Sequence, residues 1–270
     1  MSAEIHKLFA GPFVGEFGWE LFCWQGHIRY LAQNKYQKTI VACRKGLSFL
    51  YEDFADEVIE HELDSYNPDG ERNFGKNGNV PLPPDNTYRY IKPGTPHIPR
   101  YFPNTGLFNT QYPQVFHKYK NEDPDLQTFD FIIHARSRTQ TGNHPSVVRN
   151  FSEQNWNIVL KPFLDSGYTF GSIGSLADSY HIEGTQDLRG LPLDKVCAYL
   201  CKCKALIGPS SGPMHFGALC GTPLVVWSGT PNNKMRYETK WNPFNVDVKY
   251  IFGWRNARPT DIIKNIRSFT

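Results

Sequence analysis

The side chains best suited to bind an anionic ligand lie in residues 205–229. A short apolar run ends at Gly208, small residues follow it, and a helix is expected to begin near Gly212. The first N–H groups of a helix have no partner within it, and the helix dipole adds positive charge there, so a phosphate is favoured. The alternative is an ordinary strand–helix turn in which small residues serve only packing. The expected phosphate-binding residues are Gly208, Ser210, Ser211, Gly212 and His215.

Two arginines form a second candidate cluster. Arg136 and Arg138 come directly after a strand expected at 129–134. In an open α/β sheet, ligands bind at the carboxyl ends of the strands. Because the two arginines alternate with Ser137, both side chains can face one crevice and bind phosphate through paired N–H groups. The alternative is a pair of surface arginines at a strand end.

The phosphate-binding stretch resembles the C-terminal signature of the lipopolysaccharide heptosyltransferases, a glycosyltransferase family 9-like donor domain. The matching residues are Ser211-Gly212-Pro213-Met214-His215, Ala218, Gly221-Thr222-Pro223 and Gly229. The signature usually has Asp where this chain has Ser210. Weaker matches at 168–174, 187–191 and 193–202 extend the resemblance over roughly the last half of the chain. Arg136 also resembles the His-x-Arg strand of fucosyltransferase-like enzymes, where the arginine neutralises the departing diphosphate.

The same resemblance implies a catalytic carboxylate near the N-terminus. The heptosyltransferase pattern has a Gly-Asp pair after the first strand, and Gly15-Glu16 falls on it. Glu16 is therefore the implied general base, which removes the proton of the acceptor hydroxyl. Glu20 is the competing base, and a Glu that only complements the dipole of a helix start is the alternative for either residue.

The pattern of apolar residues predicts parallel α/β structure in both halves of the chain. In the first half we expect strands at 5–10, 38–43 and 57–61, and helices at 19–32 and 47–54. Residues 64–125 are rich in proline, which forbids long helices and central strands, so irregular structure is expected there. In the second half we expect strands at 129–134, 168–173, 205–207 and 224–227, and helices at 152–165, 193–202, 212–220 and 259–269.

The resemblance and this pattern together predict an α/β GT-B fold, with two Rossmann-like domains facing a central cleft and a Pro-rich irregular insertion. The acceptor-side domain is expected at 1–125, including the Pro-rich region 64–125. The nucleotide-sugar domain is expected at 126–258, followed by a C-terminal helix at 259–270.

Composition fits a globular protein, with 270 residues, 40% hydrophobic residues and a net charge of +3. The six cysteines form no C-x-x-C pair and are expected to be small buried thiols. No signal peptide or spanning segment is evident, so a cytoplasmic location without a membrane span is expected. The Asp-x-Asp pattern at Asp123 and Asp125 lies in a Pro-rich stretch, and we expect neither a metal nor a cofactor.

These observations predict a glycosyltransferase that moves a hexosyl, heptosyl or pentosyl group from a nucleotide-sugar donor to a saccharide or other hydroxyl acceptor. By resemblance, transfer is expected to invert the anomeric centre. Three alternatives remain open: a phage-type DNA glycosyltransferase acting on a hydroxymethylated base, a non-catalytic nucleotide- or glycan-binding module, and a dinucleotide-dependent oxidoreductase. The last is disfavoured because Gly11, Gly15 and Gly18 do not form G-x-G-x-x-G.

Overall fold

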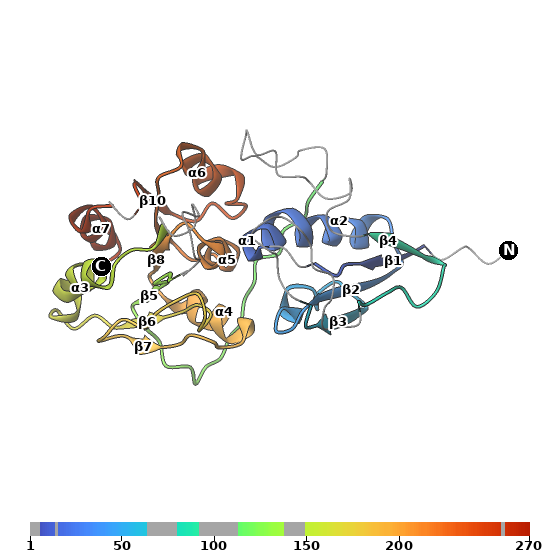
Figure 1. Ribbon diagram of the computed structural model, residues 1–270, viewed down its shortest axis with the longest axis horizontal. Helices are drawn as coiled ribbons and strands as arrows, with labels where there is room; N and C mark the ends of the chain where they lie inside the picture. The colour runs from blue at the N-terminus through green and yellow to red at the C-terminus, as the bar shows by residue number, and fades with distance from the viewer. Residues whose placement is uncertain (1–5, 14–15, 64–79, 92–112, 138–148, 255–256) are drawn as a thin grey trace. The chain divides into compact units, whose positions relative to one another are not determined.

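A computed structural model gives the structure of the chain and describes residues 6–13, 16–63, 80–91, 113–137, 149–254 and 257–270. The chain divides into two compact units, Met1–His117 and Lys118–Thr270 (Figure 1). Each unit is built on a parallel sheet, so the predicted α/β class is confirmed. Within the described residues, no helix has the length and apolar character needed to cross a membrane.

Unit 1 contains a sheet in the order β3-β2-β1-β4 with every pair parallel. Its strands are β1 (Lys7–Ala10), β2 (Lys38–Arg44), β3 (Glu57–His61) and β4 (Tyr88–Ile91). The first three were predicted. The expectation of irregular structure is wrong at β4, because this short run carries aromatic and branched side chains and no proline, and these residues favour a strand. The other described part of the Pro-rich region, 113–125, contains no helix or strand.

One helical segment follows β1. It comprises α1 (Phe17–Trp19), the π-helical η1 (Glu20–Gln25) and α2 (Gly26–Asn34), which confirms the predicted helix at 19–32 with an unpredicted π turn inside it. The predicted helix at 47–54 is wrong, since only the 3₁₀ turn η2 (Ser48–Leu50) forms. Only Leu50 and Tyr51 of this segment are buried, so it has no apolar stripe of helical spacing to bury.

Unit 2 contains a parallel sheet in the order β10-β9-β8-β5-β6-β7. Its strands are β5 (Phe131–Ile133), β6 (Phe170–Ser172), β7 (Gln186–Asp187), β8 (Ala205–Pro209), β9 (Leu224–Ser228) and β10 (Val248–Phe252). The chain adds β6 and β7 on one side of β5, then returns to place β8, β9 and β10 on the other side. This is the Rossmann strand order, and the direction of winding reverses between β5 and β8.

Helices cover both faces of this sheet. On one face α3 (Glu153–Leu164) packs against α7 (Pro259–Ile266), and Trp156, Phe163 and Ile262 form a buried core with alternate strand residues such as Trp227. On the other face α4 (Leu193–Lys202) packs against α5 (Gly212–Cys220). Three short elements complete the unit: α6 (Pro231–Met235), the π-helical η4 (Arg236–Lys240) and the 3₁₀ turn η5 (Arg267–Phe269).

The close packing of β1 on β2 predicts that Gly11→Ala destabilises unit 1. Gly11 has a φ of +120°, and a Cβ there would lie 2.3 Å from the carbonyl oxygen of Ala42 in β2. We expect a loss of about 3 kcal/mol or more in the free energy of unfolding, measured by urea denaturation.

Gly46→Ala is the matched control for this prediction. Gly46 also has a positive φ, +80°, but a Cβ there would meet nothing within 4 Å. Only the backbone conformation opposes this substitution, so a loss of about 1 kcal/mol is expected. Equal losses in the two variants would contradict the argument from close strand packing.

Candidate functional site

The two clusters at strand ends meet at the point where the sheet of unit 2 reverses direction. His134 directly follows β5, and Ser211 follows the neighbouring strand β8. The Nδ1 atom of His134 lies 2.9 Å from the hydroxyl oxygen of Ser211. The parallel pairing of β5 with β8 thus brings together residues 77 positions apart, at the edge of the sheet where ligands bind in such folds.

Helix α5 begins at this edge, as the sequence predicts. Ser211 is its N-cap residue with extended backbone angles, Gly212 and Pro213 form its first positions, and Gly221 ends it in the left-handed conformation. No side chain caps α5, whereas the hydroxyl of Ser152 caps α3 by accepting from the N–H of Asn155. A helix that starts without a side-chain cap satisfies its first N–H groups with water or a ligand.

Ser210, one of the expected phosphate-binding residues, is hydrogen-bonded to side chains of α6 and η4. Its hydroxyl is buried and accepts hydrogen bonds from the hydroxyl of Tyr237 at 3.2 Å and the amide of Asn233 at 3.3 Å. The Tyr237 hydroxyl also accepts from the N–H of Ser211 at 3.2 Å. The hydrogen bonds of Ser210 therefore hold the loop between β8 and α5 against α6 and η4. Asn233 and Tyr237 were missed because α6 and η4 carry no pattern that marks them in the sequence.

Close packing around position 208 requires a residue without a side chain. A Cβ at this position would lie 3.0 Å from the sulfur of Met214 and 3.1 Å from the carbonyl oxygen of His134. The absent side chain thus lets β8 approach both α5 and the residue that follows β5. At Gly208 the contacts favour the packing alternative over direct approach of a phosphate.

Arginines surround this strand edge. Arg136 is buried, and its Nη1 donates to the side-chain oxygen of Asn150 at 2.8 Å. Arg138, the other predicted arginine, lies outside the described residues. Arg149 and Arg236, which the sequence analysis did not select, both act electrostatically on His215 and Tyr237. The positive charge near α5 therefore comes from a wider set of arginines than the strand-end pair.

Both histidines of the site are buried and neutral. Burial first, and then the charge of Arg136, lowers the pKa of His134 to about 3. Burial, followed by the charges of Arg236 and Arg149, lowers the pKa of His215 well below its usual value. The His215 ring stacks on Tyr237 with centroids 4.4 Å apart, and it meets the ring of Trp241 at 4.5 Å. These contacts fix the orientation of His215 within the first turn of α5.

The two candidate bases of unit 1 occupy contrasting environments. Glu16 is exposed and is the N-cap residue of α1, so its carbonyl oxygen accepts from the N–H groups of Trp19 and Glu20. Glu20 is fully buried, with one carboxylate oxygen 2.7 Å from Arg44 and the other accepting from Tyr51 at 2.8 Å. Burial raises the pKa of Glu20 although Arg44 and Tyr51 oppose the change. These contacts favour a structural role for Glu20.

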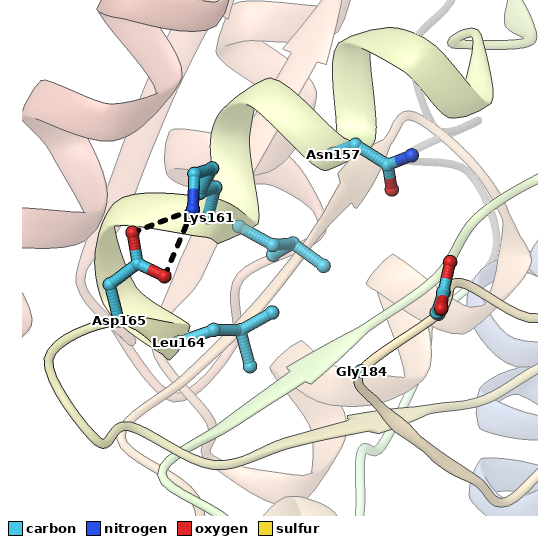
Figure 2. Close-up of a pocket in the computed structure, with 7 residues that line it drawn as sticks. Asn157, Lys161, Leu164, Asp165 and Gly184 are labelled. Atoms are coloured by element: carbon cyan, nitrogen blue, oxygen red, sulfur yellow. Dashed lines mark hydrogen bonds and ion pairs between the residues drawn. The ribbon is translucent and has the colours of Figure 1, made fainter.

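A surface pocket in unit 2 lies apart from these residues. It has a volume of about 360 Å³ and lies between α3 and the turn at Gly184 (Figure 2). The Lys161–Asp165 ion pair, at 3.0 Å, lies at its margin. The lining residues, none of them a predicted site residue, are Asn157, Leu160, Lys161, Leu164, Asp165, Glu183 and Gly184.

Solved glycosyltransferase structures are similar to this chain over most of its length. A glycosyl transferase family 9 protein from Veillonella parvula superposes with a TM-score of 0.58 at 13% identity, covering 98% of each chain. The ADP-heptose lipopolysaccharide heptosyltransferase II of E. coli gives 0.58 at 14% identity, also covering 98% of each. The iron-containing heptosyltransferase TibC, in complex with ADP-D-β-D-heptose, gives 0.53 at 15% identity over 85% of this chain and 60% of its own. No protein-family model and no curated protein sequence matches the chain.

These similarities identify the fold as the GT-B fold of heptosyltransferases, which confirms the fold predicted from the Ser-Gly-Pro-Met-His stretch. None of the three descriptions names a nucleic acid, so a DNA acceptor gains no support. TibC contains iron, whereas the described part of this chain shows no group of three or more His, Cys, Asp or Glu side chains arranged to hold a metal ion.

The buried histidines predict that the stability of unit 2 falls in acid. The unfolded chain binds a proton at His134 near pH 6.5, whereas the folded chain binds it only near pH 3. This residue therefore does not lower the free energy of unfolding above about pH 6.5. Below that pH the free energy of unfolding falls by up to about 1.4 kcal/mol per pH unit as the pH drops toward 3. Urea denaturation at a series of pH values measures the slope. His134→Gln should make it shallower, and an unchanged slope would show that His134 is not its source.

Proposed function

We propose that the chain is a glycosyltransferase that moves a sugar from a nucleotide-sugar donor to a hydroxyl group of a saccharide or similar acceptor. The observation that carries this proposal is the contact of His134 with Ser211 at the start of α5, at the strand reversal of unit 2, with the charge of Arg136 acting on His134. In Rossmann-type sheets that edge receives the phosphates of a nucleotide. The GT-B fold supplies the reaction class.

The donor diphosphate is assigned to unit 2. At the N-terminus of α5, the N–H groups of Gly212 and Met214 and the positive end of the helix dipole face the proposed diphosphate, together with the side chains of Ser211 and His215. The N–H groups of Ser211 and His215 donate within the protein, and Pro213 has none. Arg136, Arg149 and Arg236 add positive charge in the same region. Arg138 belongs to the proposed set on its place in the sequence alone. Of the structures described above, one is an ADP-heptose heptosyltransferase and another is in complex with ADP-D-β-D-heptose, so a nucleoside-diphosphate hexose, heptose or pentose is the proposed donor class.

The proposed mechanism is a metal-independent, inverting transfer. The same positive charges take the place of a metal ion, and inversion is what the resemblance to heptosyltransferases implies. As the bond between the sugar and the diphosphate breaks, negative charge develops on the diphosphate. Arginines and helix N–H groups already aimed at that charge stabilise the transition state without reorganising. The acceptor oxygen attacks the anomeric carbon from the opposite face and loses its proton to a carboxylate base.

Ser211→Asp is expected to abolish donor binding. Aspartate is as good an N-cap residue as serine, so α5 should still form. Its carboxylate would occupy the position proposed for the phosphates and repel them. Affinity for the nucleoside diphosphate that binds best in a calorimetric panel should fall by at least about 100-fold.

Ser152→Asp supplies the matched control. Ser152 is the N-cap residue of α3 in the same unit, and its hydroxyl accepts from the N–H of Asn155 at 3.2 Å. The control adds the same charge at the same kind of position, away from the proposed site. We expect it to bind the diphosphate like the parent. Equal affinity in the two variants would contradict the site assignment.

Glu16 is the proposed base, and unit 1 is the proposed acceptor-binding half. Glu16 follows β1, which lies at the winding reversal of unit 1 between β2 and β4. Its side chain is exposed, whereas the carboxylate of Glu20 is enclosed by Arg44 and Tyr51. A base must reach the acceptor hydroxyl, and only the exposed carboxylate meets that requirement.

Glu16→Gln is therefore expected to lower turnover by about 10²–10⁴-fold and to leave diphosphate affinity unchanged. Turnover is measured as diphosphate released from the best-binding nucleotide sugar in the presence of a saccharide acceptor panel. Glu20→Gln makes the same chemical change four residues on. It should reduce the free energy of unfolding by about 1–3 kcal/mol and keep the turnover of the folded protein.

The ranking of these two variants distinguishes the remaining assignments. An inactive but folded Glu20→Gln protein with normal Glu16→Gln activity would assign the base to Glu20. Parent protein that binds the diphosphate but releases none from any nucleotide sugar would favour the non-catalytic binding module.

A further inference from the structure

Three cysteine sulfurs meet where α4 packs against α5. Cys197 and Cys201 lie one turn apart on α4, with their Sγ atoms 3.8 Å apart. Cys220 is the last residue of α5, and its thiol donates to the Sγ of Cys197 at 3.7 Å. The prediction of small buried thiols holds for Cys197 and Cys220, but it is wrong for Cys201, whose side chain is exposed.

The surroundings of Cys201 stabilise a thiolate. The thiol of Cys197 and the N–H of Asn121 donate hydrogen bonds to its sulfur in the thiolate form, and the ammonium of Lys118 adds positive charge. In the thiol form the same sulfur donates to the carbonyl oxygen of Tyr119 at 3.6 Å or of Cys220 at 3.8 Å. The Lys118 side chain lies across Gly221, the residue after Cys220. These contacts lower the pKa of Cys201, whereas burial raises that of Cys220. The thiolate is the reactive form of cysteine, so reactivity is directed to the one exposed member of the cluster.

We propose that this cluster is a hydroperoxide-reactive site, in which Cys201 is oxidised and Cys197 closes a disulfide onto it. An exposed thiolate beside a second thiol is the arrangement found in cysteines that oxidise reversibly. The inference does not depend on the proposed glycosyltransferase activity.

The chemistry balances in two steps. The Cys201 thiolate attacks one oxygen of the hydroperoxide; the O–O bond breaks, hydroxide or alkoxide leaves, and sulfenic acid forms on Cys201. The Cys197 sulfur then attacks the Cys201 sulfur, its proton joins the departing hydroxyl, and water leaves as the S–S bond forms. The sulfurs must close from 3.8 Å to about 2.05 Å. Cβ atoms four residues apart on a helix lie about 5–6 Å apart and a disulfide holds them at about 3.8 Å, so the last turn of α4 around Cys201 must open for the bond to form.

Hydrogen peroxide treatment of the whole chain followed by tryptic peptide mapping tests the proposal. Residues 196–202 form one tryptic peptide that contains both Cys197 and Cys201. We expect this peptide to lose two hydrogens before any other cysteine is oxidised, and a thiol reductant to restore it. In Cys197→Ser the resolving thiol is absent, so dimedone should trap sulfenic acid on Cys201.

Cys201→Ser and Cys203→Ser form the matched pair. Cys203 lies two residues on, is half-buried, and donates to the carbonyl oxygen of Leu200 at 3.5 Å. Cys203→Ser should form the disulfide at the parent rate, and Cys201→Ser should keep Cys197 as a thiol. If Cys197→Ser does not fold, alkylation mapping of the parent protein still tests whether Cys201 is the reactive thiol. There Cys201 should react with iodoacetamide at a lower pH than an ordinary thiol, whose pKa is about 8.5. Slower oxidation of Cys201 than of Cys203, or oxidation of Cys197 in Cys201→Ser, would overturn the proposal.

Discussion

The parallel pairing of β5 with β8 is the contact on which the candidate site depends. It aligns Phe131 with Ala205 and Ile133 with Ile207, and the N–H of His134 extends the ladder to Ile207. His134 then lies close to Gly208, where a Cβ would lie 3.1 Å from its carbonyl oxygen. The His134 ring lies 2.9 Å from the hydroxyl of Ser211 at the end of the neighbouring strand. The apolar register of two short strands thus determines a polar contact at their ends.

Burial of polar groups gives this edge its rigidity. Ser210, Asn233 and Tyr237 lie inside unit 2, and each is hydrogen-bonded to another member of the group. A buried polar group without partners is costly, so such a network is stable in few arrangements. The stacked rings of His215 and Tyr237 restrict it further. On binding the proposed diphosphate, a loop held in this way would lose little conformational entropy.

The helices and strands whose bounds depend on the local pattern of residue types can be predicted from the sequence. The bounds of α4 and α5 match the predicted ranges, because each is set by apolar spacing and by Pro or Gly at its ends. The sequence also places the 134–138 and 208–215 clusters at strand ends, where ligands bind in such sheets, and the pairing of β5 with β8 then brings His134 to Ser211. Arg149, Arg236 and Tyr237 could not be found, since tertiary packing alone brings them to His215. The contacts of Glu20 with Arg44 and Tyr51 could not be predicted for the same reason, because these partners come from distant segments.

The π turn of η1 has a consequence for the loop that precedes it. A π turn holds one more residue than an α turn between the same hydrogen-bonded ends. Removing one residue from Glu20–Gln25 would restore an ordinary helix and leave the segment before it in nearly the same orientation relative to the rest of α2, because the π turn absorbs the extra residue. Removing one residue from α2 instead would rotate everything before it by about 100°. The direction in which Glu16 leaves the helix therefore tolerates a change of length within η1 and not within α2.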